Sequence, residues 1–333
     1  MDWYFIVLAV LVGLFLLILL LVYLAMAKIF HRRYEGKRHL KYFKAEDFPG
    51  LMTEAIEFQG NHKQPLRGFI YYRGERAKTK GLIIFCHGIG AGHYAYTTEI
   101  NTLASAGYQV LAFDYTGCAL SGGKSIRGLT QALIDFESAL GYVERRPDLA
   151  NLKRIIFGHS WGGYVANNIF DLGFKADKLI SIAGFNNVPD VICDVGHGLQ
   201  LFKPFFHIVN FLEFGKYANY SSINSLKKSE IPTLLIQSRC DQPIKYHNAL
   251  ARYIKATNGR GNFTYIIDEE KMHNPYLSIE GERYYNKIVS RLSYMEKKAS
   301  AEEQAAFYES IDYKLITEED PEFMKKIIDF IEE

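Results

Sequence analysis

The amino-acid sequence predicts an α/β fold in which helices cover both faces of a mostly parallel sheet of about eight strands. From residue 51 onward, short apolar runs alternate with amphipathic, helix-like stretches, which is typical of a parallel sheet. The run over 81–86 is apolar without interruption, as in a strand buried on both faces. A second apolar run, 155–157, leads through Gly158-His159-Ser160-Trp161-Gly162 into a helical pattern, which predicts a tight strand-to-helix turn.

The first half of the predicted sheet begins with a hairpin. Residues 51–59 and 66–73 are two β-like runs joined by a polar turn. We then expect alternating elements: a strand over 81–86, a helix over about 96–106, a strand over 108–113 and an amphipathic helix over 129–144. The glycine-rich loop 87–92 follows the carboxyl end of a buried strand, where open α/β sheets bind ligands.

The second half of the chain contains one long interruption. After the turn at Ser160 we expect a helix that ends at Gly173 and a strand over 178–183. Residues 185–232 then hold clustered aromatic side chains and no clean strand, and they are too many for a simple connection. We therefore expect a mostly helical lid inserted over the site at about 185–232. A peripheral helical subdomain is the alternative.

The sheet resumes after this insertion. We expect a strand over 233–238, a helix over 243–256 with Pro243 near its start, a strand over 262–267 and a closing helix over 276–298. These elements complete a domain predicted to cover 51–300. Residues 301–333 form an acidic, partly helical tail, and their apolar side chains predict one more packed helix.

A separate apolar segment lies at the start of the sequence. Residues 3–27 carry no charge, and as a helix they would be about 37 Å long at 1.5 Å per residue, enough to cross a bilayer. A cleaved signal sequence is the alternative, because Ala25-Met26-Ala27 resembles a cleavage site. Asp2, and no Lys or Arg, precedes the apolar run, which favours an uncleaved transmembrane anchor over 1–28.

Basic residues follow the apolar segment closely and define a juxtamembrane linker over 29–50. They are Lys28, Arg32, Arg33, Lys37, Arg38, Lys41 and Lys44. Positive charge next to a transmembrane helix marks its cytoplasmic side, so we expect a single-pass protein of the cell membrane with its main domain in the cytoplasm. The same cluster is also suited to anionic lipid headgroups.

Overall composition excludes some functions. The formal net charge of +2 over 333 residues gives no reason to expect a nucleic-acid partner. The four cysteines lie far apart and show no metal-ligand spacing, so we expect neither a metal site nor a disulfide framework. We expect no organic cofactor, and the sequence carries no signature of an oligomeric state.

Ser160 has the setting of an activated nucleophile. Such a serine needs a base within hydrogen-bond reach and an acid that orients the base. His273 follows the last predicted strand and Asp241 follows the strand before it, in the chain order serine, acid, histidine. Asp190 and Asp268 are alternative acids. The helix after Ser160 would point its free N–H groups at a developing oxyanion.

A set of motifs supports this constellation over roughly residues 66–290. They are His87-Gly88, Phe113-Asp114-Tyr115-x-Gly117 with Ser121-Gly122, Gly158-His159-Ser160-Trp161-Gly162-Gly163, Asp241 and His273-Asn274. With them the chain resembles the α/β-hydrolases, and among these the serine hydrolases of the Bem46 and monoacylglycerol-lipase type. The resemblance implies that the backbone N–H groups of Ile89 and Trp161 form the oxyanion hole. The chain departs from it at 116–121, where relatives often carry Arg-Gly-His-Gly-x-Ser.

These observations predict acyl transfer to water through a covalent intermediate on Ser160. An aromatic-rich lid and a membrane tether both favour an apolar acyl ester, such as a monoacylglycerol or lysolipid, over a sugar ester. Two alternatives remain open. One is a serine peptidase or amidase that uses the same three residues, and the other is a membrane scaffold that has kept the fold without catalysis.

Overall fold

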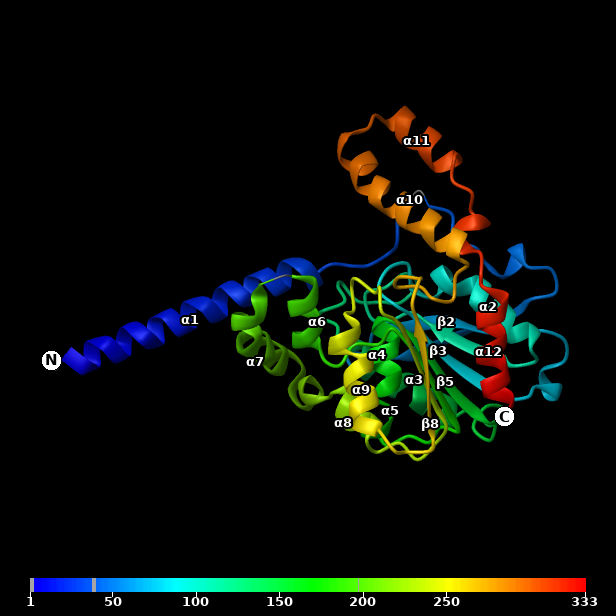
Figure 1. The fold of residues 1–333 in the computed structure, drawn as a ribbon, viewed down its shortest axis with the longest axis horizontal. Helices are drawn as coiled ribbons and strands as arrows, with labels where there is room; N and C mark the ends of the chain where they lie inside the picture. The colour runs from blue at the N-terminus through cyan, green and yellow to red at the C-terminus, as the bar shows by residue number, and fades with distance from the viewer. Residues whose placement is uncertain (1–2, 38–39, 197) are drawn as a thin grey trace.

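A single twisted sheet organises the protein, whose computed structural model describes residues 3–37, 40–196 and 198–333. The described residues form eight strands in the order β1-β2-β4-β3-β5-β6-β7-β8 (Figure 1). Their bounds are Met52–Gln59, Pro65–Tyr72, Leu82–Cys86, Gln109–Phe113, Arg154–His159, Lys178–Ile182, Thr233–Ser238 and Phe263–Asp268 for β1 to β8. β2 is antiparallel to β1 and β4, and every other pair is parallel. The predicted fold class is confirmed.

Helices cover both faces of the sheet because the central strands are apolar on both sides. In β3, Leu82, Ile84 and Cys86 face one core cluster, and Ile83 and Phe85 face the other. The first cluster is covered by α3 (Gln131–Glu144), α4 (Trp161–Asn167) and α9 (Leu250–Thr257). The second is covered by α2 (Thr97–Ser105) and α12 (Pro321–Glu332).

Two expected helices differ from those observed. The helix after Ser160 is interrupted at Asn168 and continues as α5 (Ile169–Leu172), which ends at Gly173 with φ +76°. The helix predicted over 243–256 is wrong in its first half, because α9 begins only at Leu250. Polar side chains hold the intervening loop near the end of β7: Asp241 accepts the N–H of Ile244, and Gln237 accepts that of Leu250.

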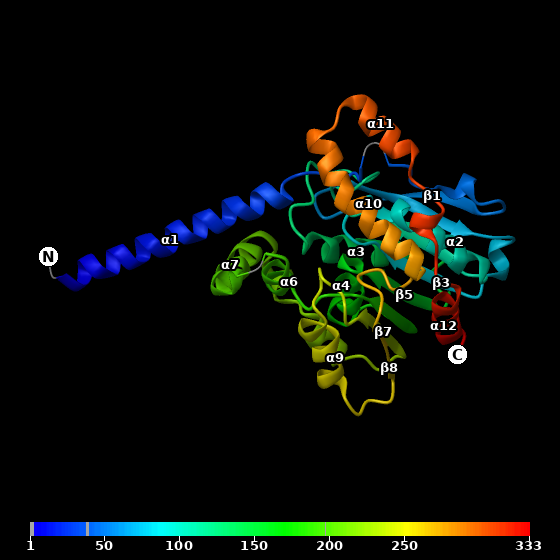
Figure 2. The same ribbon diagram turned by 45° about the horizontal axis from the view of Figure 1, so that its top comes forward.

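The segment between β6 and β7 is largely helical. It contains α6 (Val188–Val195), α7 (Lys203–Phe214) and α8 (Ser222–Leu226), and residue 197 lies outside the described residues. Phe206 and Val209 of α7 are buried in the first core cluster. α7 also packs against the helix at the start of the chain (Figure 2).

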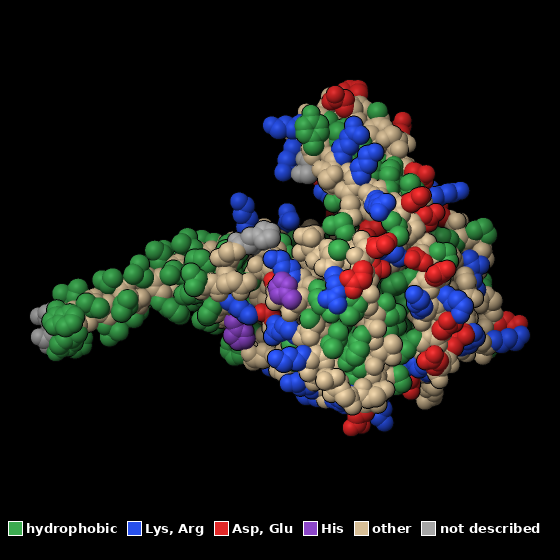
Figure 3. Space-filling model, in the orientation of Figure 1, with side chains coloured by type: hydrophobic (Ala, Val, Ile, Leu, Met, Phe, Trp, Pro, Cys, Tyr) green, Lys and Arg blue, Asp and Glu red, His purple; other side chains and the backbone are tan. Residues whose placement is uncertain are grey.

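That first helix, α1 (Trp3–Phe30), is the one helix among the described residues that is long and apolar enough to cross a membrane. It projects from the body of the protein, and apolar side chains cover its length (Figure 3). Its last turns are different, because Val22, Met26 and Phe30 are buried in the first core cluster. Asp2 and Arg38, which entered the expectations about topology, lie outside the described residues.

The basic segment after α1 is bound to the main domain. Tyr34 pairs with Cys118 in an isolated bridge, and its backbone N–H donates to the carbonyl of Gly117. The Arg33 guanidinium donates to the carbonyl oxygens of Ala119, Ser121 and Gly123. The C-terminal end of α1 is therefore connected, through residues 33 and 34, to the loop that follows β4.

The chain beyond the last strand forms an arm and then returns to the sheet. Helix α10 (Ile279–Lys298) starts after Ser278, which caps it by accepting the N–H of Gly281. It packs against α11 (Ala301–Glu309) in a small separate cluster and projects from the body (Figure 1). α12 follows and lies on the sheet, where Lys178 and Lys153 donate to carbonyls in its last turn. The tail over 301–333 thus supplies two helices, and the second is part of the core.

The packing of α12 leads to a stability prediction. Ile327 is fully buried between α12 and the sheet, so we expect Ile327→Ala to lower the free energy of unfolding by about 2–5 kcal/mol. Val289, which is exposed on α10, provides the matched control, and Val289→Ala should change it by less than about 0.5 kcal/mol. Urea unfolding of the full chain in detergent micelles measures both. Equal, small effects would contradict a core role for α12.

Candidate active site

The strand-to-helix turn at Ser160 is held by two glycines. A Cβ on Gly158 would lie 2.1 Å from the carbonyl oxygen of Gly162, and a Cβ on Gly162 would lie 1.8 Å from that of Cys86. Only residues without a side chain fit this crossing of β5, α4 and the end of β3. Ser160 itself has φ 57° and ψ −115°, a conformation that costs free energy and that the surrounding packing enforces.

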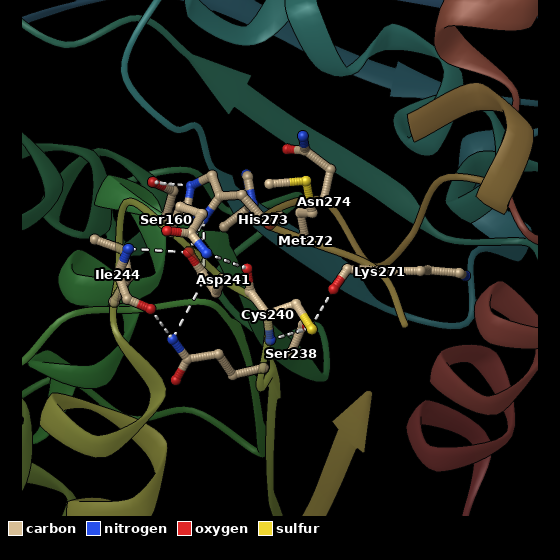
Figure 4. A network of polar contacts seen from close by, with 12 residues as sticks. Ser160, Ser238, Cys240, Asp241, Ile244, Lys271, Met272, His273 and Asn274 are labelled. Atoms are coloured by element: carbon tan, nitrogen blue, oxygen red, sulfur yellow. Dashed lines mark hydrogen bonds and ion pairs between the residues drawn. The ribbon is translucent and has the colours of Figure 1, made fainter. Parts of the chain in front are cut away.

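Ser160, His273 and Asp241 form a continuous chain of hydrogen bonds. The Oγ of Ser160 is 2.9 Å from Nε2 of His273, and Nδ1 of His273 is 3.0 Å from each carboxylate oxygen of Asp241 (Figure 4). Nδ1 carries the proton and donates a hydrogen bond to the carboxylate, so the unprotonated Nε2 accepts a hydrogen bond from the hydroxyl of Ser160. The three side chains are thus arranged for proton transfer away from Ser160.

Neighbouring groups fix the acid in this position. The side chain of Asp241 is fully buried, and its Oδ1 accepts the N–H of Ile244 at 2.9 Å. Gln237 donates its side-chain amide to Oδ2 at 3.3 Å. β7 and β8 are parallel neighbours, with Ser238 opposite Asp268, so the loops that carry Asp241 and His273 start side by side.

The alternative acids have other partners. Asp190 accepts side-chain hydrogen bonds from Asn186 and Asn187 and forms ion pairs with Lys203 and Arg252. Asp268 accepts the backbone N–H groups of residues 270 and 271. Neither is hydrogen-bonded to His273, so among the three candidate acids only Asp241 is hydrogen-bonded to the imidazole in this structure.

Sequence reasoning missed a residue that holds the histidine loop. Glu282, in the first turn of α10, is nearly fully buried and accepts the N–H of Met272 at 2.5 Å and that of Asn274 at 2.7 Å. These two amides flank His273. Glu282 therefore holds the backbone on both sides of His273 through two hydrogen bonds, and no local motif in the sequence marks it.

The groups named for the oxyanion hole lie on two segments beside Ser160. Trp161 is the first residue of α4, where helix N–H groups have no partner within the helix. Ile89, 49% exposed, follows Gly88 in the loop after β3. A Cβ on Gly88 would lie 3.4 Å from the Cβ of Ser160, so this loop packs directly against Ser160.

A second series of hydrogen bonds connects the loops next to Ser160, and sequence reasoning missed it as well. The N–H of Gly88 donates to the hydroxyl of Tyr96 at 3.0 Å, and this hydroxyl is 2.9 Å from Nδ1 of His159. Nε2 of His159 is 3.0 Å from the carbonyl oxygen of His273 and must carry the proton, so Nδ1 accepts from Tyr96. This series connects the loop of Ile89 to the loop of His273.

His159 stays neutral in this setting. Burial and the neighbouring His273 ring both disfavour its charged form and lower its pKa to about 3. His87, in the loop after β3, is also buried, which lowers its pKa to about 4, and its Nε2 accepts the N–H of Tyr115. Each of these imidazoles is hydrogen-bonded to the backbone of a neighbouring loop and helps to hold that loop in place. The described residues contain no group of three or more His, Cys, Asp or Glu that could hold a metal ion.

The chain is similar to known hydrolases in sequence and in fold. The model of a family described as serine aminopeptidase, S33, matches residues 77–206. The uncharacterized protein YfhR of Escherichia coli K12 is 27% identical over 209 residues, which cover 60% of this chain and 67% of YfhR. A monoacylglycerol lipase of Mycolicibacterium smegmatis is 34% identical over 88 residues, but these cover only 25% of this chain and 30% of the lipase.

Solved structures share the fold at low sequence identity. An esterase of Pyrococcus furiosus, Pf2001, superposes with a TM-score of 0.57 at 16% identity, covering 81% of this chain and 99% of the esterase. The acylaminoacyl peptidase of Pyrococcus horikoshii gives a TM-score of 0.55 at 20% identity, covering 76% of this chain and 43% of the peptidase. The eight-stranded sheet shares the α/β-hydrolase fold with these structures, and the family model and the named relatives support an α/β-hydrolase of the serine hydrolase type.

Proposed function

We propose that this protein is a membrane-anchored serine hydrolase that cleaves carboxylic esters of apolar, lipid-like acyl groups. The observation that carries the proposal is the alignment of Ser160, His273 and Asp241, with 2.9 Å between Oγ and Nε2 and 3.0 Å between Nδ1 and the carboxylate. This arrangement suits a serine that attacks a carbonyl carbon.

In the proposed mechanism, Nε2 of His273 takes the hydroxyl proton as Oγ of Ser160 bonds to the acyl carbon. Asp241 keeps the imidazole oriented and stabilises its charged form. The backbone N–H groups of Ile89 and Trp161 donate to the oxyanion of the tetrahedral intermediate. The carbon–oxygen bond of the ester then breaks, and the leaving alcohol takes the proton from His273. Water, deprotonated by the same imidazole, releases the acid from Ser160.

The packing of α1 supports a permanent anchor. Val22, Met26 and Phe30 are buried against the main domain, so removal of a signal sequence at residue 27 would expose the apolar surface that Val22 and Met26 cover. We propose that α1 spans the cell membrane and that the hydrolase domain is cytoplasmic, because basic residues follow the helix. An enzyme held at a bilayer is well placed for lipid-like esters.

The first test is the nucleophile. We expect Ser160→Ala to abolish covalent labelling by a fluorophosphonate and to lower ester hydrolysis by at least about 10⁴-fold, because only binding and the oxyanion donors remain. Ser290→Ala, on the exposed arm, is the matched control and should behave as the wild type. The substrates are p-nitrophenyl esters of several chain lengths, monoacylglycerols and aminoacyl amides.

The outcome separates the alternatives. Activity of Ser160→Ala within tenfold of the wild type would remove Ser160 from the mechanism. Preference of the wild type for aminoacyl amides would instead identify a peptidase or amidase. Absence of both labelling and turnover in the wild type would favour a non-catalytic scaffold.

The second test concerns the acid. Without the carboxylate, His273 would adopt the wrong tautomer, so we expect Asp241→Asn to lower kcat by at least about 10³-fold with little change in KM. Asp190→Asn, whose side chain pairs with Lys203 and Arg252 instead, should cost less than about tenfold. Steady-state kinetics of both variants decide the matter, and the reverse ranking would assign the acid to Asp190.

The third test concerns the hydrogen bonds through Tyr96 and His159. We expect Tyr96→Phe to lower kcat by about 10- to 100-fold with little change in KM, because the Gly88 amide and His159 both lose a partner. Tyr71→Phe is the matched control, since the buried Tyr71 hydroxyl has no hydrogen-bond partner among the described residues. Equal kcat values for the two variants would show that Tyr96 positions nothing that the reaction needs.

A further inference from the structure

Helix α7 lies alongside the apolar helix α1, and the contact extends from the C-terminal end of α1 back to Phe15. The two helices pack against each other, and the rings of Phe15 and Phe205 are 5.2 Å apart (Figures 1 and 2). Ile18 and Leu19 also pack against the first core cluster. The contact with the domain therefore extends from Phe30 back to the middle of α1.

The position of Phe15 fixes the depth of this contact. A span of about 20 residues within the charge-free stretch 3–27 ends between residues 22 and 27. Phe15 is then about 10–18 Å from the end of the span at 1.5 Å per residue, which is inside the hydrocarbon for every placement. Because Phe205 touches Phe15, the N-terminal half of α7 lies at hydrocarbon depth too.

The surface of α7 is suited to this environment. Leu212 is 73% exposed and Phe211 48% exposed, and Leu201, just before the helix, is 86% exposed. Residues 204–212 contain no Lys, Arg, Asp or Glu. The charged residues at the two ends of α7 have partners, since Lys203 pairs with Asp190 and Glu213 pairs with Arg127. Such an apolar surface is rarely left open to water.

We infer that the N-terminal half of α7, together with residues 199–202, is embedded in the same leaflet as the C-terminal half of α1, and that the ester reaches Ser160 sideways from this leaflet. The occupant of the exposed apolar surface is thus the hydrocarbon of the bilayer that α1 crosses. The inference rests on the proposed function, because it takes α1 as a membrane span and an apolar ester as the substrate.

A small cavity marks the route. It lies between α1 and α7 and has a volume of about 20 Å³. Its lining combines apolar residues with a few polar ones, among them Met26, Phe30, Leu129, Val209, Phe214 and the paired Arg127 and Glu213. The carbonyl of Leu129 accepts the indole N–H of Trp161 at 2.7 Å, and Trp161 follows Ser160. The inner wall of the cavity is therefore in direct contact with the residue next to the nucleophile.

An acyl chain needs more room than this cavity offers, since its volume holds about one water molecule. α7 must therefore move away from α1 when the ester enters. Gly198 and Gly215 flank the segment 199–214, and both have positive φ, +80° and +55°. A Cβ on either would meet nothing within 4 Å, so both positions have space to act as hinges.

Depth-dependent fluorescence tests the position of α7 in the full chain, reconstituted in phosphatidylcholine vesicles. An environment-sensitive dye is attached to Leu201→Cys, four residues before Phe205, in a background in which the exposed Cys240 is replaced by Ser. We expect blue-shifted emission and quenching by spin-labelled lipid chains. Dye on Val289→Cys, exposed on α10, is the aqueous control, and dye on Leu11→Cys reports on α1.

Each outcome has a definite meaning. Water-like emission from position 201, with quenching at position 11, would overturn the inference and leave the membrane anchor intact. Blue-shifted emission at 201 without lipid quenching would also overturn it, because another protein chain would then cover this surface. Water-like emission at position 11 would refute the anchor itself, and the inference with it.

Kinetics test the route. We expect Leu201→Lys to lower kcat/KM for a long-chain monoacylglycerol in vesicles by at least about tenfold, while the hydrolysis of soluble p-nitrophenyl acetate stays unchanged. Val289→Lys, the matched control, should affect neither substrate. An unchanged rate for both substrates, or an equal loss for both, would overturn entry from the leaflet. A wild type that hydrolyses no ester would refute the proposed function, and the fluorescence would still decide where α7 lies.

Discussion

The site depends on the close crossing of β5, α4 and the end of β3 beneath Ser160. Gly158 and Gly162 permit this crossing, because a side chain on either would collide with backbone at about 2 Å. The crossing gives Ser160 its positive φ and turns its hydroxyl toward His273. It also brings the Gly88 loop against Ser160, so one steric constraint positions both the serine and the segment that carries Ile89.

Parallel strands then bring the other groups to the same edge. β7 and β8 are neighbours, so the loops after them carry Asp241 and His273 to within 3.0 Å of each other. Two further contacts hold this arrangement from outside the loops. Glu282 binds the amides on both sides of His273, and Tyr96 with His159 connects the histidine loop to the loop after β3. The geometry of the site therefore depends on Glu282, Tyr96 and His159 as well as on its three central residues.

Much of the fold could be predicted because it follows from local patterns. Runs apolar at every position gave the buried strands, and β7 begins and ends where the sequence predicts. The helix predicted from Pro243 failed because the polar groups of Asp241 and Gln237, which belong to the end of β7, capture the N–H groups of Ile244 and Leu250. The same limit hid Glu282, Tyr96 and His159, whose partners are distant in sequence or lie in backbone that no pattern marks.

By itself, the sequence determined the fold class, the turn at Ser160, the order of serine, acid and histidine, and an apolar segment long enough for a bilayer. These features depend on spacing and polarity over a few neighbouring residues. The tertiary structure decided which acid reaches His273, that α12 completes the core, and that α1 lies against α7. Each of these is a choice among distant partners of similar chemistry, which is settled only when packing and buried hydrogen bonds are satisfied together.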